Sequence, residues 1–175
     1  MDEPIVQTEE QPVSVLQALS EKRRAIADTK EAYIPVPGYD SAPPILLVKY
    51  RLLSGNELNV IGERVMRQVK GRWERQLQAA AQTLVAACDG IFYDMEDGSG
   101  PQPLTYSEQP ITGFTEALAS ALGFADKVGD INRPTEVLFA LFGNNEVMVS
   151  QHSIRLNRWM TDTSIEVSAE TFPNL

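Results

Sequence analysis

The apolar and polar positions of the N-terminal third follow four different patterns. Residues 1–12 are polar and acidic, and residues 13–33 carry one modest apolar stripe at helical spacing. Prolines across residues 34–44 remove backbone donors, so an extended connector is expected there. Residues 45–53 end in alternating apolar and basic positions, which predicts a strand with one buried face. Residues 91–106 are the candidate partner for this strand.

Two consecutive helices are expected after the strand. Ser54 and Glu57 have the spacing of a capping box, in which the serine oxygen and the glutamate carboxylate each accept a backbone N–H. Apolar residues at steps of three and four continue this helix over residues 56–70 and predict one buried face with Leu58, Ile61, Val65 and Val69. Gly71 predicts a break, and a longer amphipathic helix is expected over residues 72–92.

Three more helices are predicted in the C-terminal half. Thr112 is placed to cap a short helix that Gly123 ends, and Pro134 suits the first turn of another that Gly143 ends. The last helix is expected over residues 146–161 because its apolar positions again share one face.

These elements predict a mainly α fold, a small helical domain with a minor β-strand or hairpin element and flexible acidic termini. The expected organisation has an acidic N-terminal tail and amphipathic helix over residues 1–33. The helical domain follows over residues 34–161, and residues 162–175 form a flexible C-terminal tail.

The composition narrows the function classes. With 175 residues, 43% of them hydrophobic and 22% charged, the chain suits one soluble domain. No apolar run approaches the ~18 residues of a membrane span, and the acidic N-terminus lacks the features of a signal peptide, so a cytoplasmic protein is expected.

The chemistry-bearing residues are few. Cys88 and His152 are the single cysteine and histidine, so neither a zinc cluster nor a serine–histidine or cysteine–histidine site is available. No glycine-rich nucleotide loop occurs, and the acidic segment 94–100 does not have the ligand spacing of a calcium loop. We therefore expect no enzyme activity, no catalytic residue, no cofactor and no metal. His152 and Cys88 are expected in the core.

Charge is distributed unevenly along the chain. The net charge is −9, yet residues 49–75 hold seven bases and three acids, whereas residues 89–130 hold eight acids and one base. Such a split permits head-to-tail self-association, with ordinary uneven surface charge as the alternative. The basic segment is interpreted first as a solvated helix face and second as a partner-binding surface, with nucleic acid less favoured. The candidate partner-binding residues are Arg64, Arg67, Lys70, Arg72, Trp73 and Arg75.

The order of these parts resembles a known family. A proline-rich lead over residues 34–39 precedes the strand that ends with residues 48–53. The long helical stretch 64–91 follows and contains Arg72-Trp73-Glu74-Arg75. The likeness continues through residues 137–142 and 154–160. Over roughly residues 34–160 the chain is similar to tail assembly chaperones of long-tailed, siphovirus-type bacteriophages.

That resemblance implies a small, mostly helical, non-enzymatic protein of the host-cell cytoplasm. Such a protein binds the tape-measure protein, promotes polymerisation of tail-tube subunits around it, and is absent from the mature virion. The first alternative is a virion structural protein of the neck or head–tail connector, because such proteins are also small, helical and charge-split. The second is a helical nucleic-acid-binding regulator, whose affinity would fall steeply with salt.

Overall fold

The computed structural model describes the backbone of residues 31–171 and the side chains of residues 31–164. Within it 49% of residues are helical and 17% are in strands, and the strands form an antiparallel sheet. The protein is therefore an α+β mix, and the predicted mainly α class is wrong. Of the acidic tail and helix expected over residues 1–33, residues 1–30 lie outside the described part of the chain.

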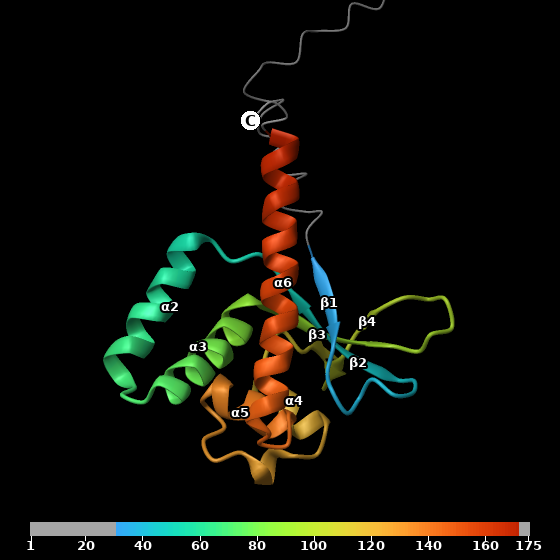
Figure 1. Cartoon of the computed structure of the whole chain (residues 1–175). Coiled ribbons are helices and arrows are strands. Elements are labelled where there is room, and N and C mark those ends of the chain that lie inside the picture. Colours follow the sequence, from blue (N-terminus) through green and yellow to red (C-terminus); the bar gives the residue numbers. More distant parts are fainter. Residues whose placement is uncertain (1–30, 172–175) are drawn as a thin grey trace, which may run out of the picture. The chain divides into compact units, whose positions relative to one another are not determined.

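The strands form a four-stranded antiparallel sheet, where the sequence pattern predicts only a minor β element (Figure 1). Its strands follow one another in the order β1-β2-β3-β4, and a separate two-stranded hairpin joins β5 to β6. In β2, Val48 is opposite both Ile34 of β1 and Ile91 of β3. The strands are β1 Ala32–Pro35, β2 Ile45–Tyr50, β3 Cys88–Asp94, β4 Gln102–Pro103, β5 Thr105–Tyr106 and β6 Gln109–Pro110.

The expected extended connector begins with a strand. Ala32 and Tyr33 belong to β1, although the pattern assigned them to the end of a helix. β1 lies at the edge of the sheet, where a proline is tolerated, and Pro35 is its last residue. Residues 34 and 35 are extended in β1, whereas residues 37–44 form turns and bends, so the predicted extended connector is wrong over most of its length.

The helix expected over residues 72–92 is too long by five residues. Helix α3 spans Arg72–Ala87, and the chain then continues directly as β3. The predicted pairing of the first strand with residues 91–106 is correct in part, since Leu47 faces Phe92. Tertiary pairing decides this boundary, because residues 88–94 complete the second edge of β2 with their backbone groups.

The remaining helices start close to the predicted positions. Pro134 occupies the first turn of its helix, and Gly123 and Gly143 follow theirs with φ of +72° and +63°, as expected. Thr115 rather than Thr112 precedes α4, and its side chain makes no capping bond. The other helices are α2 Gly55–Gln68, α4 Glu116–Ala121, η1 Ala125–Lys127, α5 Pro134–Leu141 and α6 Glu146–Thr171.

Helix α6 continues ten residues beyond the predicted boundary at residue 161. The backbone of residues 162–171 is helical, and residues 172–175 lie outside the described part of the chain. Thr163 is buried, so the packed face of α6 also extends past residue 161. Residues 162–171 are acidic and have no apolar repeat of their own, so the sequence pattern does not predict that the helix continues.

The core lies between one face of the sheet and the helices. Val48, Tyr50 and Ile91 of the sheet are almost fully buried, as are Leu84 of α3 and Leu156 of α6. Helix α3 packs against α2, α5 and α6, and α6 also contacts β1. Helix α6 therefore contacts both the sheet and α3, and α3 in turn contacts α2 (Figure 1).

Candidate functional site

The candidate site is the helical hairpin formed by α2 and α3, which three residues, 69–71, connect. Ile61 and Val65 of α2 are buried, and the side of α3 with Leu77 and Leu84 belongs to the same core. Helix α2 packs chiefly on α3, so much of its surface is open. All six residues predicted to bind a partner lie on this hairpin or its turn.

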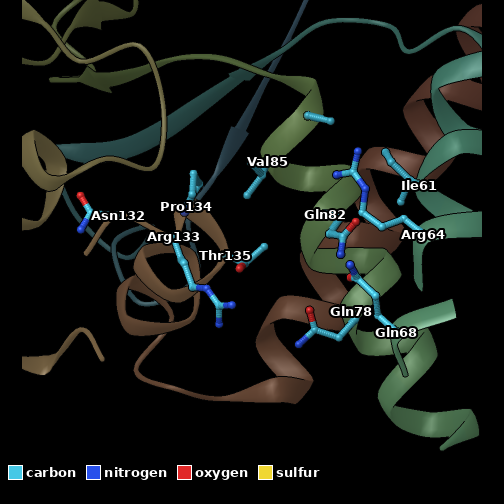
Figure 2. A pocket seen from close by; sticks show the side chains of 11 residues that line it. Ile61, Arg64, Gln68, Gln78, Gln82, Val85, Asn132, Arg133, Pro134 and Thr135 are labelled. Carbon is cyan, nitrogen blue, oxygen red and sulfur yellow. The ribbon is translucent and has the colours of Figure 1, made fainter. Parts of the chain in front are cut away.

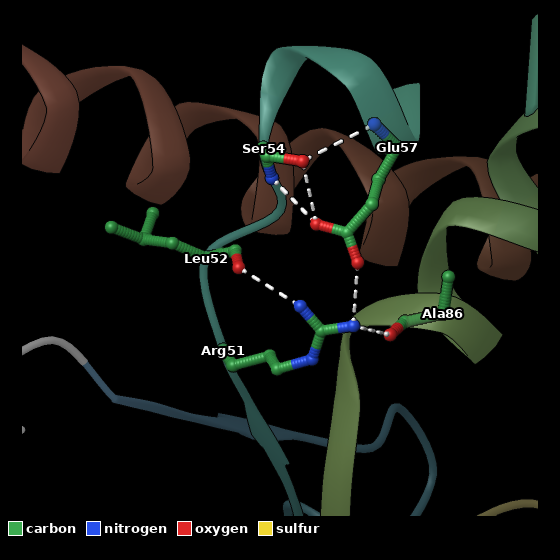
Figure 3. A network of polar contacts seen from close by, with 5 residues as sticks. All are labelled: Arg51, Leu52, Ser54, Glu57 and Ala86. Carbon is green, nitrogen blue, oxygen red and sulfur yellow. Dashed lines mark hydrogen bonds and ion pairs between the residues drawn. The ribbon is translucent and has the colours of Figure 1, made fainter. Parts of the chain in front are cut away.

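A network around Arg51 fixes the base of the hairpin to the sheet (Figure 3). The Arg51 guanidinium donates hydrogen bonds to the Leu52 carbonyl at 3.2 Å, the Glu57 carboxylate at 2.8 Å and the Ala86 carbonyl at 3.2 Å. The predicted capping box is confirmed, since Ser54 N–H donates to Glu57 and Glu57 N–H donates to the Ser54 hydroxyl. One side chain therefore joins the end of β2, the start of α2 and the end of α3.

The electrostatic state of Glu57 reflects this network. Its pKa is lowered to about 2, first by the hydrogen bond from Arg51 and then by the hydrogen bonds from the Ser54 backbone and hydroxyl. The carboxylate is therefore ionised at neutral pH, where it satisfies two donors at the start of α2. Arg51 and Glu57 stabilise the hairpin and are not free for a partner.

Three of the six predicted residues have their charge or polar group engaged within the chain. Arg67 pairs with Glu63 at 3.2 Å, although its side chain is 79% exposed. Arg75 is half-buried and donates from Nε to the Val69 carbonyl, which closes the turn between the helices. Trp73 Nε1 donates to Glu146 Oε2 at 3.1 Å. Arg75 is thus a structural residue, and its interpretation as a partner contact is not supported by its position.

The other three predicted residues have no ion pair within residues 31–164. Arg64 lies on α2, Lys70 in the turn and Arg72 at the start of α3, and all are exposed. Lys49, which contributed to the basic segment in the sequence, instead pairs with Glu31 at 2.7 Å and Asp89 at 3.1 Å in the sheet. The hairpin therefore retains a smaller basic surface than the sequence indicates.

An apolar stripe runs along α2 beside this basic surface. Leu58, Gly62 and Met66 follow one another at steps of four, so they share one face of the helix. Leu58 is 39% exposed and Met66 is 62% exposed. We name these three residues the α2 stripe. The apolar spacing predicts Leu58 on the buried face, which is wrong, and it does not predict the stripe. The signal in the sequence was Met66, an apolar residue directly after Val65 of the buried face.

A polar cleft of about 490 Å³ lies on the opposite flank of α2 (Figure 2). Arg64 and Gln68 of α2 line one wall, Gln78 and Gln82 come from α3, and Asn132–Thr135 precede or begin α5. We name it the α2–α5 cleft. The sequence gives no signal for it, because Arg64 and Arg133 are brought together by the packing of α5 on α3.

The histidine and the cysteine, which often carry catalytic chemistry, lie respectively in the core and against it. His152 is fully buried, as predicted, and its pKa is lowered to about 4 by desolvation and by the Arg155 charge. Cys88 is half-buried against the core, and burial raises the pKa of its thiol to about 11. At neutral pH this thiol is protonated and weakly nucleophilic. Neither side chain lines the α2–α5 cleft.

Two further findings concern the described part of the chain. It holds no group of three or more His, Cys, Asp or Glu side chains placed to bind a metal ion. No helix within it combines the length and apolar character that crossing a bilayer requires.

No protein-family model, no curated protein and no solved structure matches the chain.

Proposed function

We propose that this protein is a non-enzymatic binding protein, a tail assembly chaperone of a long-tailed bacteriophage. It binds the tape-measure protein through the α2–α3 hairpin and promotes tail-tube polymerisation. The observation that carries the binding role is the α2 stripe, whose apolar side chains lie exposed beside unpaired basic residues. The identity of the partner comes from the resemblance of residues 34–160 to the chaperone family.

The geometry of α2 suits the packing of another helix. A Cβ added at Gly62 would meet no atom within 4 Å, so the helix surface there is open. A small residue between Leu58 and Met66 lets a partner helix approach the backbone, and the two flanking side chains can pack into its grooves. A long helical tape-measure protein offers such apolar faces before the tube covers them.

The charges beside the stripe add selectivity. Lys70 and Arg72 lie at the turn, and Arg67 keeps a highly exposed guanidinium although it pairs with Glu63. A partner helix with acidic residues beside its apolar face would be attracted to this end of the hairpin. The rest of the chain is strongly acidic, which keeps an assembling complex dispersed.

The proposal is tested by recovery of a tagged protein from cells that assemble the phage, with mass spectrometry of the bound chains and of purified particles. We expect the tape-measure protein in the bound fraction and this chain absent from particles. Retention in particles would favour the neck or connector alternative. Recovery of nucleic acid in place of protein, lost at high salt, would favour the regulator alternative.

A matched pair of variants tests whether the α2 stripe is the binding surface. Met66→Glu places a charge on the stripe, and Ile154→Glu makes the same change at a site on α6 that is 59% exposed. Only Met66→Glu should lose the tape-measure protein, because a charge facing an apolar helix face remains unpaired. Equal recovery by both variants would exclude the stripe as the contact.

A further inference from the structure

We propose that the α2–α5 cleft binds a carboxylate-bearing peptide segment, the acidic part of the partner that the α2 stripe engages. The identity of this partner rests on the proposed function. The cleft itself is defined by side chains from three separate elements, and none of its lining residues belongs to the stripe. It gives the hairpin a second, polar recognition surface on the other flank of α2.

Two arginines from different elements lie on the walls of the cleft (Figure 2). Arg64 has no ion pair among the residues with described side chains. Arg133 is 68% exposed and makes only long ion pairs, to Asp130 at 3.6 Å and to Glu136 at 3.8 Å. Both guanidinium groups are therefore able to turn toward a ligand, and each can hold a carboxylate with two hydrogen bonds.

The glutamines indicate that the ligand has amide groups as well as a charge. Gln68, Gln78 and Gln82 line the cleft, and a side-chain amide both donates and accepts hydrogen bonds, as a peptide backbone does. Gln82 Oε1 is buried without a hydrogen-bond partner. Once the Gln82 side chain turns into the cleft, a peptide N–H would satisfy this oxygen, whereas a phosphate or a simple carboxylate has no such donor.

The size and charge of the cleft agree with a short segment. Its volume of about 490 Å³ lies within the range of ligand-binding clefts, about 300–1,000 Å³. Asp130 and Glu136 beside Arg133 limit the positive potential, which disfavours a polyphosphate backbone. One or two well-placed guanidinium groups are sufficient to bind the carboxylates of an acidic peptide.

The test uses the full-length protein labelled with ¹⁵N and two peptides with blocked ends, tetraglutamate and tetralysine. We expect tetraglutamate to cause saturable shifts in amide resonances at the cleft-lining residues of α2, α3 and residues 132–135. Tetralysine should leave these resonances unchanged. Absence of saturable shifts with tetraglutamate, or shifts confined to other residues, would overturn the proposal. So would equal binding of inorganic phosphate, which would show a site for charge alone.

Variants separate the cleft from the general basic surface. The double variant Arg64→Ala/Arg133→Ala should weaken tetraglutamate binding about tenfold or more, since charge-assisted hydrogen bonds are lost. Arg158→Ala is the matched control, because Arg158 is exposed on α6 and does not line the cleft. Equal weakening in both would overturn the proposal.

A second variant keeps the test valid if Arg64→Ala/Arg133→Ala does not fold. Gln82→Leu removes the unpartnered buried oxygen, so it should keep or raise the melting temperature while weakening tetraglutamate binding. Unchanged binding would contradict the assigned role of Gln82.

Recovery of the tape-measure protein separates the two proposals. If wild-type protein fails to recover it yet binds tetraglutamate, the proposed function fails alone. If recovery succeeds without tetraglutamate binding, the cleft proposal fails alone.

Discussion

Tyr50 in β2 and His152 in α6 share a buried hydrogen bond, with 2.9 Å between Tyr50 Oη and His152 Nε2. Both side chains are fully buried. The centroids of the Phe142 ring and the His152 imidazole lie 5.1 Å apart in an edge-to-face arrangement. His152 Nδ1 has no hydrogen-bond partner. This pair joins the sheet to the last helix, and it makes the fold sensitive to acid.

Acid should destabilise the protein through His152. Its pKa is lowered to about 4 in the folded state by desolvation and by Arg155, whereas the unfolded chain protonates near its ordinary value. The stabilisation is therefore complete above about pH 6.5 and falls as the pH drops toward 4. The shift corresponds to about 3 kcal/mol of unfolding free energy. Urea unfolding at several pH values measures this loss.

The matched variant for this experiment removes both polar partners. Tyr50→Phe/His152→Leu leaves neither a buried hydroxyl nor an imidazole, so its stability should change less between pH 6.5 and 4.5 than that of the wild type. Tyr50→Phe alone leaves the imidazole without a partner and should cost about 1–3 kcal/mol at pH 7. Parallel pH profiles of wild type and double variant would contradict the role given to His152.

The elements that sequence predicts well are those decided by local interactions. The capping box at Ser54 needs only residues within one turn, and it begins α2 as expected. Gly123 and Gly143 end their helices for an equally local reason. The burial of His152 follows from its place on an apolar helix face. Such features could be predicted because their partners are close in the sequence.

The errors arise where distant segments compete with local preference. Residues 88–92 continue the apolar pattern of α3, yet β2 offers them an unpaired strand edge. Gly90 inside the supposed helix and the aromatic, β-branched run 91–93 were local signs of a strand. The α2–α5 cleft had no such sign, because it depends on how α5 packs. Three of the six predicted binding residues already had internal partners, which a linear count of charges cannot show.

Arg51→Ala should loosen the attachment of the hairpin to the sheet. The change removes hydrogen bonds to Glu57 and to two carbonyls, and we expect a loss of about 1–2 kcal/mol. The Glu57 pKa should rise from about 2 toward its ordinary value, which carboxyl NMR titration measures directly. Glu57 stabilises the fold above about pH 4.5, and this contribution falls as the pH drops toward 2.

Arg67→Ala serves as the control for Arg51→Ala. Its ion pair with Glu63 is exposed and four residues apart on one helix, so its loss should change stability by less than about 0.5 kcal/mol. Denaturant unfolding of the two variants at pH 7 compares them. Equal losses would show that the Arg51 network contributes no more than a surface pair.

Gly90→Ala should destabilise the sheet. Gly90 has φ of +142°, which L side chains rarely adopt, and an added Cβ would lie 3.0 Å from Phe92 Cε2. The expected cost is about 1–3 kcal/mol in unfolding free energy. Gly113→Ala is the control, because its φ is unstrained and a Cβ there meets no atom within 4 Å. Similar unfolding free energies for Gly90→Ala and Gly113→Ala would contradict backbone strain at position 90.

Gly62→Ala should instead stabilise the protein while testing the α2 stripe. Gly62 lies inside α2 with open space at its Cβ position, so alanine should add about 0.5–1 kcal/mol and raise the melting temperature by a few degrees. The added methyl group also lies between Leu58 and Met66, where we propose that a partner helix approaches the backbone. Thermal unfolding should therefore improve while recovery of the tape-measure protein declines. A rise in both would show that the helices do not approach at Gly62, because a close contact cannot accept the methyl group without moving apart.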